Sequence, residues 1–267
     1  MQITWVLEQE VFKDRHQRLA DAARQAGHRV LAWYDTWLEN NNWPKFEDEH
    51  IVFHGSLGNA DVVAKNLPWR PGAFCNTSAF ACSAWYNDAR TWLLHEKWAF
   101  STVKDFVESP DRYLEAIGSP DSFFVRPDSP LKPFSGRVLN RENVSLEALD
   151  YGFYYEDIDL PIVIAPIAEV RQEWRFVIMN QKPIAVSSYV ADGRTESSSG
   201  CDGQVSSFTE ELVKSLVPPE LVYVLDVCQS DGKLKLLELN PFSGADLYGC
   251  DRAAIVAGME KVLGITS

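Results

Sequence analysis

Three oxygen-bearing side chains near the C-terminal end have types and a spacing that suit a metal ion. Asp226 lies in the apolar run Val222–Cys228, and Glu238 and Asn240 lie at the end of a second run, Leu234–Leu239. Both runs are apolar on both faces, as in a sheet covered on both sides, where a carboxylate needs a partner. Two carboxylates and an amide oxygen form a set of ligands that suits Mg²⁺. A helix N-terminus or an arginine beside each carboxylate is the alternative explanation.

The turn between the two runs decides whether these side chains share a face. The Asp231-Gly232 pair predicts a hairpin, and side chains alternate between the faces of each strand. A two-residue turn places Asp226 and Glu238 on opposite faces, whereas a three-residue turn that adds Ser230, with Gly232 left-handed in a bulge, brings them together. We therefore predict the three-residue turn. We also expect Glu238→Gln to lower turnover far more than stability, and even to raise stability by relieving repulsion between the carboxylates.

This arrangement resembles the magnesium signature of the ATP-grasp superfamily, whose Asp and Glu-x-Asn are followed by a turn of small residues. The resemblance implies that Asp226 and Glu238 hold two Mg²⁺ ions against the ATP phosphates and that Asn240 holds one of them. It also implies that Ser243 and Gly244, in the following turn, contact the second substrate. The implied fold is an ATP-grasp fold of the α/β (α+β) class, in which mixed and antiparallel sheets enclose the nucleotide.

A loop rich in proline supplies cations upstream of the hairpin. A predicted strand, Ser122–Arg126, leads into a stretch that places three cations and a Ser-Gly pair among three prolines. In the ATP-grasp pattern such a strand ends in a lysine that contacts the α- and β-phosphates, and a glycine-containing loop then closes over the triphosphate. Arg126 stands in the lysine position, and Lys132, Ser135 and Gly136 correspond to the closing loop. Arginine keeps the charge and adds a two-pronged donor.

The next segment resembles the adenine and ribose side of an ATP-grasp site. The apolar run Pro161–Ala168 corresponds to the hinge that faces adenine, with Ala168 in contact, and Glu173 corresponds to the glutamate that holds the ribose hydroxyls. Arg175 is assigned a phosphate or acylphosphate role, with a surface salt bridge as the alternative. Peptide-ligase members carry an arginine two residues before the metal-binding aspartate, where this chain has Val224, and Arg175 is a candidate to replace it. Together with Arg126 and Lys132, Arg175 resembles the two-arginine, one-lysine clade of the superfamily, found in phages and bacterial gene clusters.

The rest of the chain indicates two domains. We predict an N-terminal α/β domain over 1–95 and an ATP-grasp domain over 96–267, with a small subdomain over about 96–160 and a C-terminal one over about 161–267. Loop 191–204 is a candidate lid, with a surface loop as the alternative. The other predicted strands are Ile3–Leu7, His28–Tyr34, Ile51–Phe53 and Ile184–Tyr189, and the predicted helices are Lys13–Ala26, Ser83–Leu94, Thr102–Glu108, Glu210–Leu216 and Arg252–Leu263.

Composition excludes some classes of function. The chain has 267 residues and a formal net charge of −13, which argues against nucleic acid as a partner. Its apolar runs are too short for a membrane span and its N-terminus does not resemble a signal peptide, so we expect a cytoplasmic protein. The five cysteines and five histidines show no spacing typical of disulfides or zinc. Oligomeric state cannot be deduced from these patterns.

The function that we predict is carboxylate–amine ligation with ATP and Mg²⁺. Arg126, Lys132 and Arg175 are assigned to catalysis, acting on a carboxylate that becomes an acylphosphate before an amine displaces phosphate. The substrates are expected to be small molecules or peptides. Two alternatives remain open at this stage, namely a small-molecule kinase and a nucleotide-binding module without turnover.

Overall fold

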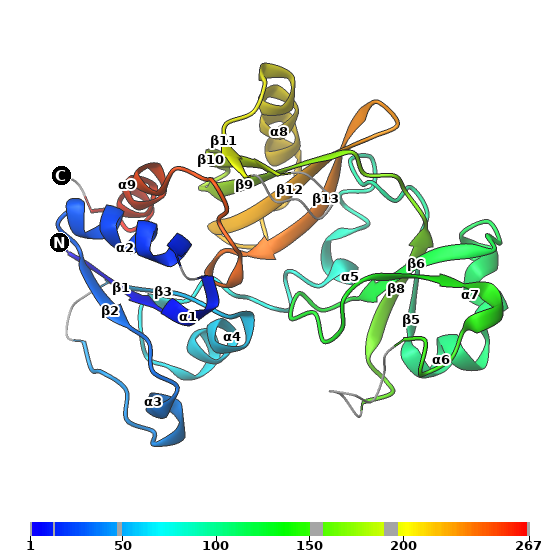
Figure 1. Cartoon of the computed structure of the whole chain (residues 1–267), viewed down its shortest axis with the longest axis horizontal. Coiled ribbons are helices and arrows are strands. Elements are labelled where there is room, and N and C mark those ends of the chain that lie inside the picture. Colours follow the sequence, from blue (N-terminus) through cyan, green and yellow to red (C-terminus); the bar gives the residue numbers. More distant parts are fainter. Residues whose placement is uncertain (1, 13, 47–49, 150–156, 190–196, 266–267) are drawn as a thin grey trace.

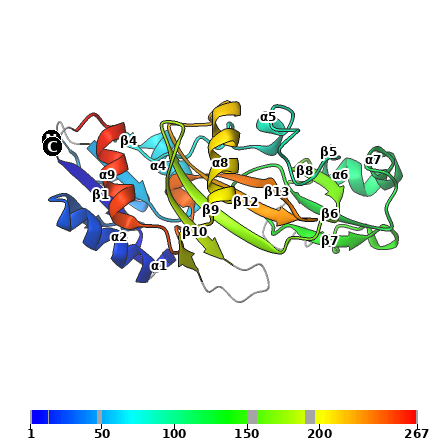
Figure 2. The ribbon, with the colours of Figure 1, turned by 90° about the horizontal axis from the view of Figure 1, so that it is seen from above.

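The computed structural model describes residues 2–12, 14–46, 50–149, 157–189 and 197–265, which form three sheets. A five-stranded sheet lies in the middle of the long axis, with a four-stranded sheet toward each end (Figure 1 and Figure 2). The N-terminal sheet is parallel and the other two are antiparallel. These mixed layers agree with the predicted α/β (α+β) class.

The N-terminal sheet has the strand order β2-β1-β3-β4. All five residues of β1 are buried, and α2 returns the chain to the parallel neighbour β2 after Gly27, whose positive φ of 80° favours glycine. The predicted strands and the α2 helix are confirmed here. The elements of this unit are β1 (Ile3–Leu7), α1 (Gln9–Phe12), α2 (Asp14–Gln25), β2 (Arg29–Ala32), α3 (Thr36–Glu39), β3 (His50–His54), α4 (Leu57–Asn66) and β4 (Pro71–Gly72).

The small sheet has the order β5-β8-β6-β7 and is antiparallel. Two short helices pack on it, one capped by Thr102, whose hydroxyl accepts from Asp105 N at 3.1 Å, and one that begins at Pro110, which the sequence pattern did not predict. Since β8 pairs within this sheet, a subdomain boundary near residue 161 is too early. The elements are β5 (Ala99–Thr102), α6 (Val103–Glu108), α7 (Pro110–Ala116), β6 (Ser122–Pro127), β7 (Arg137–Asn140), the 3₁₀ turn η1 (Arg141–Asn143) and β8 (Pro161–Pro166).

The large sheet has the order β11-β10-β9-β12-β13 and is covered on both faces. One face packs, through Val177, Val222 and Val224, against the N-terminal sheet and the last helix, and the other packs against α8 and residues 80–93. The elements are β9 (Gln172–Met179), β10 (Lys182–Tyr189), β11 (Ser198–Ser199), α8 (Gly203–Ser215), β12 (Val222–Ser230), β13 (Lys233–Pro241), the 3₁₀ turn η2 (Phe242–Gly244) and α9 (Arg252–Val262).

Two predicted helices differ from the structure. The helix predicted over Ser83–Leu94 is limited to α5 (Cys82–Trp85), because residues 92–94 pair with β13 instead. Leu236 N donates to Trp92 O at 2.6 Å, and Leu94 N donates to Leu236 O at 2.9 Å. Helix α8 begins seven residues earlier than predicted, because the Asp202 carboxylate accepts from two backbone amides of its first turn.

The remaining sequence-based expectations concern the candidate lid and the membrane. Residues 190–196 of the lid lie outside the described residues, and the rest of the segment holds β11 and the start of α8. Within the described ranges no helix combines the length and the apolar character that a bilayer span requires. The five cysteines are free thiols.

Candidate active site

A bulge in the β12–β13 hairpin brings the two carboxylates onto one face. The turn contains two residues, Asp231 and Gly232, whose φ angles of 48° and 73° are both positive, as a type I′ turn requires. The ladder shifts register between Asp226 and Val227, so Asp226 lies directly opposite Glu238. The predicted three-residue turn is therefore wrong, although the shared face that it was meant to explain is present. The extra residue is Leu237, further from the turn.

Asn240 links the two carboxylates. Its side-chain amide donates to Asp226 Oδ2 at 3.2 Å and to Glu238 Oε2 at 3.0 Å. Asp226 and Asn240 are buried, and the Glu238 side chain is 13% exposed. Among the described residues no group of three His, Cys, Asp or Glu side chains could hold a metal ion, and this trio contains only two carboxylates. Its oxygens nevertheless form a set that a hard cation prefers, with room for phosphate as a further ligand.

Two cations of the small sheet reach Glu238 from across a cleft. Arg126, at the end of β6, forms a hydrogen-bonded ion pair with Glu238 Oε1, and Lys132 Nζ lies 3.0 Å from Glu238 Oε2. Burial alone raises the pKa of Glu238, but the charges of Arg126 and Lys132 outweigh burial and hold that pKa well below its usual range. Burial lowers the pKa of Arg126, and the Glu238 charge more than reverses this. Both remain charged at neutral pH.

Arg175 makes the corresponding contact with Asp226. It lies opposite Asp226 on the neighbouring strand β9, and its Nε and Nη2 donate to the two carboxylate oxygens at 2.8 and 2.7 Å. Its Nη1 donates to Asp246 O at 2.8 Å, and the guanidinium lies 4.8 Å from the centre of the Tyr248 ring. Val224 is fully buried in the core. The arginine that pairs with Asp226 is therefore on β9, whereas the resemblance to the peptide ligases implied one two residues before Asp226, on β12 itself.

The cleft between the small and large sheets contains two adjoining cavities. One, of about 180 Å³, is lined by apolar side chains and by the hinge residue Ala168, and the other, of about 250 Å³, is lined by Arg126, Lys132 and Glu238. Phe124, Arg126 and Leu237 line both. An apolar chamber that continues into a charged one has the polarity of a nucleotide, with the base in the first and the phosphates in the second.

The predicted closing loop borders the charged cavity. Lys132 has a left-handed φ of 51°, which is strained for a lysine, and its side chain reaches Glu238. Gly136 also lines the cavity, and a Cβ at this position would lie 2.5 Å from the tip of the Phe124 ring, so a larger residue would require that ring to shift. Ser135 precedes it, and its carbonyl accepts from Arg137 Nε at 3.3 Å. The phosphate role of Ser135 and Gly136 stays a prediction.

Glu173 lies near the network but outside both cavities. It is on the same face of β9 as Arg175, and the Tyr189 hydroxyl donates to its carboxylate. Burial raises the pKa of Glu173, and the hydrogen bond from Tyr189 opposes that rise. Tyr189 stacks on Tyr248 with 4.8 Å between ring centres. Contact between Glu173 and a ribose stays a prediction.

Ser243 and Gly244 lie against the N-terminal unit. Ser243 is fully buried, its Oγ accepts from Phe74 N at 2.9 Å, and its carbonyl accepts from Gly55 N at 2.8 Å. A Cβ on Gly244 would lie 2.3 Å from the Leu57 side chain at the start of α4. In this arrangement the turn joins the hairpin to the N-terminal sheet, and its contact with a second substrate stays a prediction.

Residues that the sequence did not reveal surround Arg175 and the face that carries Asp226. Arg15 of α2 pairs with Asp246 and lies 5.1 Å from the centre of the Tyr248 ring. Tyr248 has a strained φ of 41°, and Arg252 holds its carbonyl by donating from Nη2 at 2.7 Å. Arg252 is four residues from Tyr248, but Arg15 is 231 positions from Asp246, so the sequence gives no local signal for that pair.

Comparisons with known proteins agree with this geometry. A family model of the ATP-grasp domain, family 2 of the two-arginine, one-lysine clade, matches residues 101–257, more than half of the chain. A search of curated proteins found no match.

Three solved structures illustrate the likeness. The chain is similar to the D-cycloserine synthetase DcsG, with a TM-score of 0.66 and 14% identity over 100% of each chain. It is similar to the ATP-grasp ligase PsnB, solved with a minimal precursor, with a TM-score of 0.62 and 12% identity over 100% of this chain and 99% of that one. For D-alanine-D-alanine ligase from Bacillus anthracis the TM-score is 0.59, with 14% identity over 99% of this chain and 95% of that one. At these identities the likeness confirms the predicted fold.

Proposed function

Because the chain belongs to the ATP-grasp family, in family 2 of the two-arginine, one-lysine clade, we propose that it is an ATP-dependent ligase that joins a carboxylate to an amine. One observation carries the proposal. Asp226, Glu238 and Asn240 on the large sheet face Arg126 and Lys132 of the small sheet across a cleft with an apolar and a charged chamber. The triphosphate of a nucleotide is complementary in charge to Arg126 and Lys132, and a divalent cation is complementary to the two carboxylates.

The donor set fits Mg²⁺. Two carboxylates on neighbouring strands, bridged by an amide, offer a few protein oxygens and leave other positions for water and phosphate. When bound, Mg²⁺ supplies positive charge to the phosphate oxygens. Asp226, Glu238 and Asn240 would hold it, and the cations that now pair with Glu238 would then be available to the phosphates.

The side chains have separate roles in the proposed reaction. A substrate carboxylate oxygen attacks the γ-phosphorus of ATP, and the bond from that phosphorus to the β,γ-bridging oxygen breaks. The products of this step are an acylphosphate and ADP. The amine nitrogen then attacks the acyl carbon, phosphate departs with its oxygen, and the nitrogen loses a proton to give the amide. Arg126 and Lys132 orient the triphosphate and offset its charge during transfer. Arg175, which pairs with Asp226, is assigned to offset charge on the acyl phosphate, replacing the arginine whose position Val224 occupies.

The substrates are proposed by class. Solved neighbours include PsnB and the macrocyclase MdnC with precursor peptides, which supports a peptide or small-molecule carboxylate and amine. The net charge of −13 disfavours a polyanionic partner such as nucleic acid. We place the reaction in the cytoplasm, because the cysteines are free and ATP is the proposed co-substrate.

A single set of assays tests the proposal. Calorimetry and thermal shift with MgATP measure binding, for which a micromolar Kd, about −8 kcal/mol, is expected. Phosphate release is then measured with pools of amino acids and short peptides in the presence of hydroxylamine, which traps an acylphosphate as a hydroxamate. Hydroxamate that forms together with ADP and phosphate supports the ligase. A stable phosphorylated product identifies a kinase, binding without turnover identifies a binding module, and no binding of MgATP overturns the whole assignment.

A further inference from the structure

His95 lies beside the apolar cavity, where the small sheet, the edge strand β13 of the large sheet and the hinge residues 166–169 come together. The residues just before it are joined to the edge strand β13 by the backbone hydrogen bonds of Leu236, one residue from Leu237. The His95 ring stacks on Phe124 of the small sheet, with 5.6 Å between ring centres and 19° between planes. His95 also lines the 180 Å³ apolar cavity together with Phe124 and Leu237. The His95 side chain thus contacts the small sheet, and the residues just before it in the chain are bonded to the large sheet.

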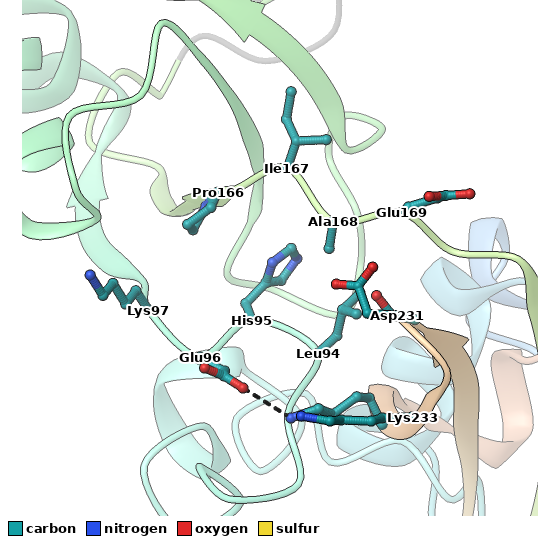
Figure 3. A pocket seen from close by; sticks show the side chains of 12 residues that line it. Leu94, His95, Glu96, Lys97, Pro166, Ile167, Ala168, Glu169, Asp231 and Lys233 are labelled. Atoms are coloured by element: carbon teal, nitrogen blue, oxygen red, sulfur yellow. Dashed lines mark hydrogen bonds and ion pairs between the residues drawn. The ribbon is translucent and has the colours of Figure 1, made fainter.

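The same side chain borders a second cavity on the outer side of the hinge. This outer cavity, of about 550 Å³, is lined by His95, by the hinge residues 166–169 and by charged residues of the hairpin tip (Figure 3). In Figure 3 the His95 ring lies between Pro166 and Ala168, at the boundary of the two cavities. A base in the apolar cavity would therefore meet His95 at its outer edge.

The surroundings of the His95 ring decide its charge and its hydrogen-bonding capacity. Pro166 lines the outer cavity together with His95, and because a proline has no N–H, its backbone can offer the ring only a carbonyl acceptor. Burial and the charge of Arg126 lower the pKa of His95 to about 4, so the imidazole is neutral at physiological pH. A neutral imidazole that donates from one nitrogen has an acceptor lone pair on the other. No contact among the described residues uses that second nitrogen.

We propose that His95 selects the base of the nucleotide, its free ring nitrogen accepting a hydrogen bond from the 6-amino group of adenine. A base with a carbonyl at position 6 would place an acceptor against an acceptor, and such mismatches at a buried polar group are discriminated strongly. His95 lies before residues 101–257, which the family model matches, so the matched region does not include this residue. The inference rests on the proposed nucleotide binding.

The test compares ATP with ITP, which carries a carbonyl in place of the 6-amino group. The ratio of the two Kd values is measured by calorimetry, with Mg²⁺, for the unchanged protein and for three variants. His95→Phe keeps a ring to stack on Phe124 but has no acceptor, and His95→Asn keeps one donor and one acceptor without the ring. His50→Ala is the control, because His50 begins β3 in the N-terminal sheet and lines neither cavity.

The unchanged protein and the control are expected to prefer ATP over ITP by about tenfold or more, equivalent to about 1.4 kcal/mol. His95→Phe should lose most of this preference, and His95→Asn should retain part of it. An unchanged ratio in His95→Phe, or equal affinities in the unchanged protein, overturns the inference while nucleotide binding stands. Absence of binding to either nucleotide overturns the proposed function, and this inference with it.

Discussion

Replacing Glu238 by glutamine separates the metal role of this residue from its structural role. The Glu238 and Arg126 side chains are 13% and 14% exposed, so the pair is largely shielded from water, whereas Lys132 is 41% exposed. Removing one partner of a buried ion pair lowers the free energy of unfolding by about 3–5 kcal/mol, and an exposed pair contributes about 1 kcal/mol or less. Glutamine still accepts one hydrogen bond, and Arg126 borders an open cleft. We therefore expect a loss of about 2 kcal/mol.

This expectation reverses the one drawn from the sequence. Relief of repulsion between two carboxylates was expected to raise stability, but each carboxylate has its own arginine, so little repulsion is left to relieve. The cations hold the pKa of Glu238 well below its usual range, so its stabilising effect is present above pH about 4.5 and is lost as pH falls through the native pKa. The difference between the two proteins should therefore shrink in acid.

The assays are thermal unfolding at pH 7 and pH 4 and ATP turnover at pH 7. The variant should unfold about 5 °C lower at pH 7, with a smaller gap at pH 4, and turnover should fall by about 100-fold or more. Asp111→Asn, which breaks an exposed pair with Arg141, is the control and should change neither quantity appreciably. Turnover equal to that of the unchanged protein would refute the metal role, and an equal unfolding temperature at pH 7 would refute the contribution of the ion pairs.

Two further predictions follow from the cleft and from one buried acid. Arg126→Ala should weaken MgATP binding by at least about tenfold in calorimetry, whereas Lys182→Ala, at the exposed first residue of β10, should leave it unchanged, and equal effects would contradict the phosphate role. Burial raises the pKa of Glu220 to about 7, so the native protein disfavours the ionised form and loses stability as pH rises from about 4.5 through 7. Glu220→Gln should therefore raise the free energy of unfolding at pH 8 by about 1–2 kcal/mol, after allowance for partial exposure, and leave it unchanged at pH 4, as measured by denaturant unfolding. A gain of the same size at both pH values would show that charge is not the cause.

The hairpin and the side chains that it brings together could be predicted because their signals are local. Period-two alternation, the Asp-Gly turn and the oxygen ligands are all visible within about twenty residues. The position of the bulge is not visible there, because the extra residue, Leu237, lines the two cavities together with Phe124 of the small sheet, which is about a hundred positions away in the chain. The prediction of a shared face was right in outcome and wrong in cause.

Distant pairing also explains the helix that was predicted too long. The spacing of Trp85, Ala89 and Leu93 suits a helix, and all three are buried. Beyond residue 85, however, the chain continues in irregular turns, in which Ala89 N donates to Trp85 O at 3.0 Å, and residues 92–94 then pair with the free edge of β13. A backbone hydrogen bond to a distant strand overrides a weak local preference.

The group of Arg15, Asp246 and Tyr248 illustrates the limit of such reasoning. Arg15 and Asp246 are 231 positions apart, and neither belongs to a motif. They meet because α2 packs beside α9 and the loop that precedes α9. Only the folded chain shows that the N-terminal unit contributes a cation close to Arg175.

The chain enters and leaves the small sheet at neighbouring points. His95, on the way in, touches Pro166, on the way out, so residues 99–166 form an insertion attached along one short line. A body attached in this way can swing about that line as a hinge, and the amplitude grows with distance from it. This line lies beside the apolar cavity, which His95 lines, while Arg126 and Lys132 reach Glu238 beside the charged cavity. The two ion pairs therefore tie the small sheet to the large one at the charged cavity, and the turn that follows Asn240 is itself tied to the N-terminal unit through Ser243.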